Sequence, residues 1–182
     1  MAYKMSEIED LMLDKLKLLY EYQFKQFDHA KAQSARLDDK ASKYLTFASL
    51  LVAILSIIAK SYIVETETLK FWSFSTCVVA LIFFSFIQIS LVIRHLFACM
   101  KITKVAKLSS DKAMQSYFKT NDISVIYDGL SEDLGESINK YENSNEEKVK
   151  ELETAYSHMV QGGYILILLM IFIIFDVIAK YV

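Results

Sequence analysis

The sequence contains no proline and only four glycines among its 182 residues. At average usage a chain of this length would carry roughly nine prolines, so the residues that most often interrupt helices are almost missing. No stretch alternates between apolar and polar residues over the ten or so positions that a membrane-spanning β-strand needs. These absences predict an all-α protein.

Residues that could build a catalytic or metal site are also scarce. The chain has two cysteines and three histidines, and it has neither a glycine-rich phosphate loop nor a His-x-x-x-His pair. Cys77 and Cys99 are too far apart to meet on one helix, so no intramolecular disulfide framework is indicated. His95 and Cys99 share a helical face, but two ligands do not make a zinc site. We therefore expect no enzyme activity, no catalytic residue, no metal and no cofactor.

What the chain does have is long apolar runs. The run from Phe71 to Ile93 holds 23 consecutive residues without Asp, Glu, Lys or Arg, which is roughly 35 Å as a helix. The hydrocarbon core of a bilayer is about 30 Å thick. We therefore expect an integral membrane protein with three transmembrane helices, at residues 44–64, 71–93 and 159–182.

The distribution of lysine and arginine orients these helices. Basic residues precede the first apolar run and follow the second, whereas the short segment 65–70 between them carries Glu65 and Glu67. Residues 65–70 are therefore predicted to be an outer loop. The N-terminus is then cytoplasmic, and three crossings place the C-terminus outside.

Two long amphipathic helices are expected on the cytoplasmic side, within residues 1–43 and 94–158. The apolar stripe of the first includes Met12, Leu16 and Leu19, and it continues into the first apolar run without a breaker. The second is expected to open at Ser131 and to continue into the last run. Stripes of this length need partners, which predicts a cytoplasmic stalk with coiled-coil pairing and a homo-oligomer.

Between the second apolar run and this second helix, the pattern is more broken. Thr120-Asn121-Asp122 resembles a loop. Ile123–Tyr127 is a small apolar element that fits either one helical turn or a short strand, and Asp128-Gly129 is expected to close it.

Small and hydroxyl-bearing side chains follow one line along the first apolar run, in steps of three and four. The line consists of Thr46, Ser49, Ala53, Ser56 and Lys60. Small residues allow helices to pack closely, and hydroxyl groups can also line a pore, with Lys60 at its outer mouth. Gln88 of the second run is expected to contact another helix, because an amide that faces lipid is unfavourable.

Charged residues suggest two further contacts. A basic block of Arg94, Lys101, Lys104 and Lys107 follows the second apolar run. It suits an anionic inner leaflet or a partner, although the orientation rule alone would also account for it. The cluster Asp38-Asp39-Lys40 before the first run and the cluster Asn145-Glu146-Glu147-Lys148 before the last run can pair, and the ion pairs between the helices are expected to involve Asp39, Lys40 and Lys148.

Two segments carry a resemblance to a known group of proteins. Leu37–Leu45 resembles the Asp-x-Lys-Ala segment that leads into the first span of small bacterial membrane effectors of nucleotide-signalled anti-phage systems, the Pycsar and CBASS types. Asn145–Ala155, of the form Asn-x-x-Lys-x-x-x-Leu-x-x-Ala, is similar to the segment before their last span. The resemblance implies a protein that responds to infection, oligomerises and disturbs the bilayer.

The expected function is therefore a non-enzymatic oligomeric effector or sensor subunit of a bacterial defence system, located in the inner membrane as a multi-pass protein. The expected partners are membrane lipids, further copies of the chain, and a cytoplasmic partner protein or small signalling molecule. With a net charge of −2, direct nucleic-acid binding is not expected. Two alternatives stay open: a membrane scaffold that recruits a cytoplasmic partner, nucleic-acid-binding proteins included, and a small ion channel or transporter.

Overall fold

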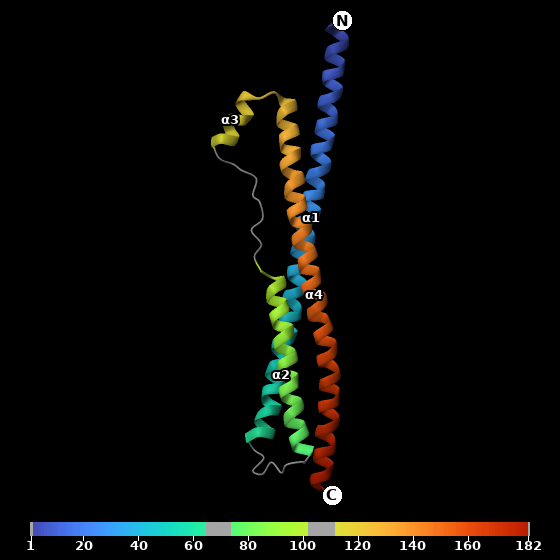
Figure 1. Ribbon diagram of the computed structural model, residues 1–182, viewed down its shortest axis with the longest axis vertical. Coiled ribbons are helices and arrows are strands. Elements are labelled where there is room, and N and C mark those ends of the chain that lie inside the picture. The colour runs from blue at the N-terminus through green and yellow to red at the C-terminus, as the bar shows by residue number, and fades with distance from the viewer. Residues whose placement is uncertain (1, 65–73, 102–111, 182) are drawn as a thin grey trace. The chain divides into compact units, whose positions relative to one another are not determined.

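The computed structural model describes residues 2–64, 74–101 and 112–181. They form four helices, α1 (Ala2–Val64), α2 (Phe74–Cys99), α3 (Lys112–Thr120) and α4 (Ile123–Tyr181) (Figure 1). No strand occurs in these three ranges. The predicted all-α class is confirmed, as the absence of proline and the scarcity of glycine lead one to expect.

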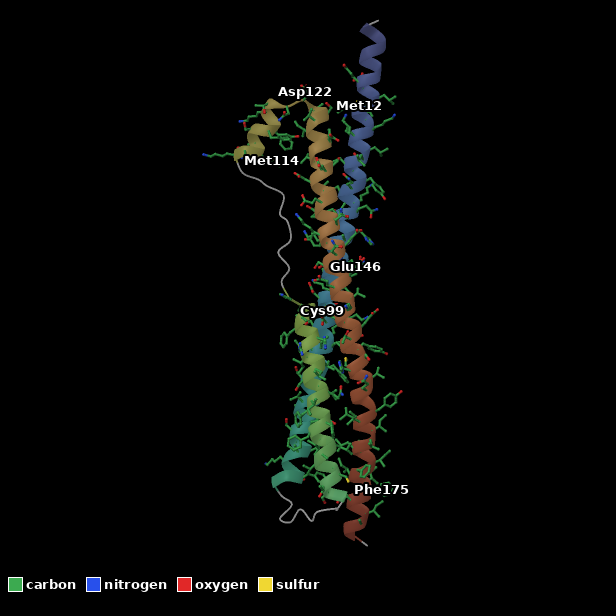
Figure 2. All side chains as sticks on the ribbon, in the orientation of Figure 1. Met12, Cys99, Met114, Asp122, Glu146 and Phe175 are labelled. Carbon is green, nitrogen blue, oxygen red and sulfur yellow. The ribbon has the colours of Figure 1, made fainter. Side chains whose placement is uncertain are left out.

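Three of these helices, α1, α2 and α4, are each long and apolar enough to cross a membrane. Their number agrees with the three predicted spans. The helix α2 continues beyond Ile93 and ends at Cys99, which is labelled in Figure 2. The segment with Glu65 and Glu67 lies outside the described residues, and so do Lys104 and Lys107 of the basic block.

The chain divides into two compact units. Unit 1 comprises Met1–Arg36 and Ile102–Glu147, and unit 2 comprises Leu37–Lys101 and Lys148–Val182. The helices α1 and α4 supply residues to both units, whereas α2 belongs to unit 2 and α3 to unit 1. Within unit 2, α2 runs antiparallel to the segments of α1 and α4 beside it (Figure 1).

The core of unit 2 forms where α1, α2 and α4 pack together. The buried positions of α2 alternate in steps of three and four: Ser75, Val78, Ile82, Ser85, Ile89, Val92, Leu96 and Cys99. The buried residues Ala41, Ala48 and Leu55 of α1 are seven residues apart. Because such steps average 3.5 residues, close to the helical turn of 3.6, they keep one narrow face of a helix towards its neighbours.

Leu16 of the predicted apolar stripe of α1 is half-buried in unit 1, as expected, but the inward positions before and after it each differ by one residue from the prediction. Met12 is 60% exposed and Leu19 43% exposed, whereas Leu13 and Tyr20 are half-buried. The Tyr20 ring packs edge-on against Tyr127 of α4, with 5.6 Å between the ring centroids. Adjacent residues are apolar at both places, Leu11 to Leu13 and Leu18 to Tyr20, so spacing alone does not say which of them faces inward.

The helix α4 begins at Ile123, so the separate element at Ile123–Tyr127 and the helix start at Ser131 are both wrong. Gly129 lies within the helix rather than closing a turn. A Cβ atom at this position would be 2.6 Å from the Tyr117 hydroxyl oxygen, which donates a hydrogen bond to the Val125 carbonyl at 2.9 Å. Gly129 therefore provides the space in which α3 packs on α4.

A buried polar contact joins the long helices of unit 1. The Asn145 side-chain Nδ2 donates to the Ala30 carbonyl oxygen at 2.9 Å, and both residues are buried. At the surface of α4, a hydrogen bond from Lys140 and its positive charge lower the pKa of Glu136. This second contact is fully exposed and adds little to stability.

Candidate functional site

An ion pair joins α1 and α4 in unit 2. The Lys148 ammonium lies 2.7 Å from Asp38 Oδ1 and 2.8 Å from Asp38 Oδ2. The Lys148 side chain is only 10% exposed, and that of Asp38 is 43% exposed. Lys148 was predicted to form an ion pair between helices, but with Asp39 and Lys40 as the expected residues of the other helix. Its carboxylate partner is instead Asp38.

The two neighbouring charges of α1 make local contacts. Asp39 accepts a hydrogen bond from Lys43, one turn further along the same helix, at 2.6 Å. The Lys40 ammonium lies 5.8 Å from the ring centroid of Tyr44. Both Asp39 and Lys40 are exposed, because a shift of one or two residues turns a side chain out of the narrow packed face of the helix.

Two histidines connect α2 with α4. His95 Nδ1 lies 2.7 Å from Glu151 Oε2, and His158 Nδ1 lies 3.1 Å from Gln88 Oε1. The two imidazole rings are stacked, with centroids 5.6 Å apart and an angle of 15° between their planes. Gln88 thus makes the contact with another helix that was expected of it.

The spacing of polar residues in the sequence could have predicted this cluster. His95 follows Gln88 by seven residues, and His158 follows Glu151 by seven residues. Residues seven apart lie on the same line of a packed helix, so polar residues at this spacing on two helices can meet in pairs. The sequence analysis did not bring His95 and His158 together, because the alignment of α2 with α4 is not encoded in either segment alone.

A third polar contact lies between the start of α2 and the last part of α4. The Ser75 hydroxyl donates to Asp176 Oδ1 at 2.8 Å, and both residues are buried. Ser75 is in the first turn of α2, where the helix dipole favours a negative charge. The side chain of Lys180, one turn after Asp176, lies outside the described residues.

The hydroxyl-bearing line of α1 faces away from the core of unit 2. Its members Thr46, Ser49, Ala53, Ser56 and Lys60 are all exposed. The three hydroxyl groups donate to carbonyl oxygens four residues earlier, at Ser42, Leu45 and Val52, over 3.0, 2.9 and 2.7 Å. Among the described residues these side chains have no helix packed over them, so packing with another helix or lining a pore would involve a second molecule.

The described part of the basic block is accessible. Arg94 and Lys101 are both exposed.

Cys99 is buried and Cys77 is exposed, and both have free thiols. Among the described residues, no group of three or more His, Cys, Asp or Glu side chains is arranged to hold a metal ion.

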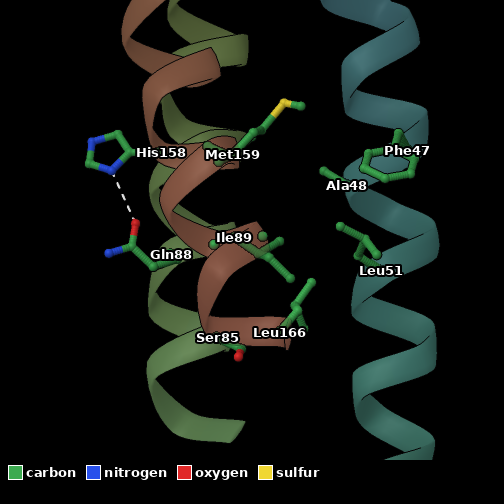
Figure 3. A pocket seen from close by; sticks show the side chains of 12 residues that line it. Phe47, Ala48, Leu51, Ser85, Gln88, Ile89, His158, Met159 and Leu166 are labelled. Atoms are coloured by element: carbon green, nitrogen blue, oxygen red, sulfur yellow. Dashed lines mark hydrogen bonds between the residues drawn. The ribbon is translucent and has the colours of Figure 1, made fainter. Parts of the chain in front are cut away.

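A cavity of about 120 Å³ lies where the three helices of unit 2 meet. Phe47, Ala48 and Leu51 of α1 form one wall, and α2 and α4 form the others (Figure 3). Gln88 and His158 border it too, but their side chains point away from the α1 wall in Figure 3. The cavity is therefore mainly apolar, with the polar pair at its edge.

Comparison with protein families, with curated proteins and with solved structures finds no match to this chain. A functional interpretation therefore rests on the polar contacts, the outward line of α1 and the arrangement of the helices themselves.

Proposed function

We propose that the protein is a non-enzymatic membrane effector or sensor subunit of a bacterial anti-phage defence system. In this proposal α1, α2 and α4 cross the inner membrane, with the N-terminus in the cytoplasm and the C-terminus outside. Unit 1 receives a cytoplasmic partner or a small signalling molecule. Unit 2 responds with a change in the packing of its helices, and assembled copies then disturb the membrane.

The observation that carries this proposal is the continuity of two helices. The helices α1, of 63 residues, and α4, of 59 residues, are each unbroken, and each supplies residues to both compact units. A small translation or rotation of a helix is a common element of protein switches. A binding event at unit 1 would therefore reach unit 2 along two helices.

The polar contacts of unit 2 suit such a switch. Asp38 and Lys148 join α1 to α4, and His95 and Glu151 join α2 to α4, all close to where α1 and α4 begin their unit 2 segments. A shift of α4 would separate both pairs. Since Asp38 is 43% exposed, water can rehydrate it when the pair opens, so that a signal of a few kcal/mol would be sufficient.

The output would come from the hydroxyl-bearing line of α1. In an assembly of several copies, with their cytoplasmic helices paired as a coiled coil, this outward line would face its equivalents. Hydroxyl groups along such an interface can support a wet passage, and Lys60 would lie at its outer mouth. The resemblance of Leu37–Leu45 and Asn145–Ala155 to anti-phage membrane effectors supports a leak that is triggered by infection.

Replacing Ser49 and Ser56 together by Leu tests this proposal. Cells that express each variant are infected with a panel of phages, and a potential-sensitive dye reports depolarisation. The wild type should depolarise before lysis, and the double variant should lose at least most of that signal because its passage is apolar and narrow. Ser90→Leu is a suitable control, since Ser90 is an exposed serine of α2 whose hydroxyl bonds to the Phe86 carbonyl. Equal leakage in the double variant and the wild type would exclude the pore.

The second candidate is a scaffold that recruits a cytoplasmic partner, and one observation favours it. Several large apolar side chains of α1 in unit 1 are exposed: Leu11, Met12, Leu18, Leu19 and Tyr22. An exposed apolar helix face is typical of a surface that binds another helix. Under this alternative, charge reversal of Lys101 together with Lys104 and Lys107 would release the partner from the membrane, and the membrane potential would stay intact with or without infection.

A further inference from the structure

The cavity in unit 2 has a feature that helix packing does not explain. Gly162 and Gly163 follow one another in the middle of α4, and both border the cavity. A Cβ atom at Gly162 would be in ordinary contact with Gln88, at 3.7 Å from its Cβ. At Gly163 it would meet no atom within 4 Å. The space beside position 163 is therefore open, and a larger residue could occupy it. Glycine at this position is unfavourable for the helix relative to alanine, yet it leaves this space empty.

The walls of the cavity offer little to water. Ala48, Leu51, Ile89, Met159 and Leu166 supply apolar groups. The hydroxyl of Ser85 already donates to the Leu81 carbonyl at 2.9 Å. The Gln88 oxygen is engaged by His158 and both side chains point away from the α1 wall (Figure 3). Cavities of this kind stay dry and accept apolar molecules; one of about 150 Å³ holds benzene or xenon.

We propose that this cavity binds an uncharged apolar group of the size of a benzene ring or of a hydrocarbon segment of about five carbons. The volume of about 120 Å³ sets the size. The walls disfavour charged ligands, because they hold no Asp, Glu, Lys or Arg, and their polar side chains Ser85, Gln88 and His158 are already hydrogen-bonded. Two sources carry this chemistry: a free lipophilic molecule and an acyl chain of a membrane lipid. The occupant would contact α1, α2 and α4 at once.

Occupancy of the cavity would stabilise the packed form of unit 2. This consequence rests on the proposed function, in which unit 2 changes its packing, whereas the binding itself does not. A lipophilic molecule would then oppose or set the threshold of the switch. A binding measurement without any readout of leakage keeps the two proposals separate.

Methionine methyl groups provide the readout. Met159 borders the cavity, whereas Met170 of α4 is 54% exposed and reports on the general partitioning of an added molecule into the surrounding lipid. With the full chain in lipid nanodiscs and ¹³C-labelled methionine methyls, benzene is titrated. The Met159 resonance should shift and reach saturation, and any change of Met170 should stay proportional to the benzene added. A Met159 response without saturation would overturn the proposal.

Variants that fill the cavity complete the test. Gly163→Val should abolish the saturable shift of Met159, and Ala48→Val should do so independently, since Ala48 is 2% exposed and forms part of the wall. Ala80→Val adds the same volume at an exposed position of α2 and should leave the shift unchanged. Retention of the shift in both filled variants, with helix content intact by circular dichroism, would also overturn it.

Spin-labelled phospholipids distinguish the two sources. If an acyl chain occupies the cavity, a label on the chain should broaden the Met159 methyl in the wild type more than in Gly163→Val, and benzene should reverse the difference. If the ligand is a free molecule, benzene binds with saturation and the broadening is the same in both proteins. Absence of saturable benzene binding together with equal broadening would contradict both versions.

Discussion

The ion pair between Lys148 and Asp38 yields an asymmetric prediction. Removing Asp38 leaves the charge of a Lys148 side chain that is only 10% exposed, whereas removing Lys148 leaves the charge of an Asp38 side chain that is 43% exposed. Lys148 therefore has little access to water, but Asp38 is readily rehydrated. Asp38→Asn should therefore destabilise unit 2 more than Lys148→Met does.

The magnitudes follow from the same exposures. Breaking a fully buried pair by removal of one partner costs about 3–5 kcal/mol, and the partial exposure of Asp38 reduces this to about 2–3 kcal/mol for Asp38→Asn. Lys148→Met retains the apolar stem of the side chain, so that only a screened interaction is lost, about 1 kcal/mol or less. Once Lys148 is Met, the Asp38→Asn change should add only about 0.5 kcal/mol.

The free energy of unfolding is measured for the wild type, both single variants and the double variant, by titration of mixed micelles with a denaturing detergent. The exposed pair Asp39 and Lys43 in one helix is the matched control, because its 2.6 Å contact joins side chains that are 63% and 72% exposed, respectively. Disrupting that pair should change stability by less than about 0.5 kcal/mol. Lys148→Met being as destabilising as Asp38→Asn would refute the reasoning from burial.

Two further predictions concern contacts of α3 and α2. Gly129→Ala should displace the Tyr117 hydroxyl and raise amide exchange throughout α3. The free energy of unfolding should change little, because the lost hydrogen bond of about 1 kcal/mol is offset by the higher helix propensity of alanine, also about 1 kcal/mol. Unchanged amide exchange in α3 would contradict this prediction. Ser75→Ala should destabilise the protein by about 1–3 kcal/mol because Asp176 loses a buried donor. The control Ser90→Ala removes only a hydrogen bond within its own helix and should change the free energy of unfolding by no more than about 0.5 kcal/mol. Equal effects of the two variants would argue against the buried contact.

The fold class and the long helices could be predicted from the sequence, and the details of burial could not. The missing prolines and the uninterrupted apolar runs led directly to α1, α2 and α4. At the start of α1 Leu16 was placed correctly, but Met12 was predicted to face inward where Leu13 does, since Leu11, Met12 and Leu13 are all apolar and composition alone does not say which of them is buried. The helical start at Ile123 was missed because glycine ordinarily signals a turn, and only the packed Tyr117 explains Gly129.

For the candidate site, too, features of a single helix could be predicted from the sequence, and contacts between helices could not. The line from Thr46 to Lys60 could be read from its spacing, because it depends on the periodicity of one helix. Lys148 was recognised as a residue of an inter-helix pair, but its partner was misidentified by one position. The histidine pair was missed, although His95 and His158 each occupy a position seven residues from another polar group.

By itself the sequence determined how many long helices the chain forms, how apolar they are and which side chains share a face of each. These properties follow from backbone geometry and from the local run of residues. Only the tertiary structure decided that Lys148 meets Asp38, that His95 stacks on His158 and that a cavity remains beside Gly163. Such contacts depend on how far one helix is shifted and rotated against another, and that alignment is set by the packing of all three helices together.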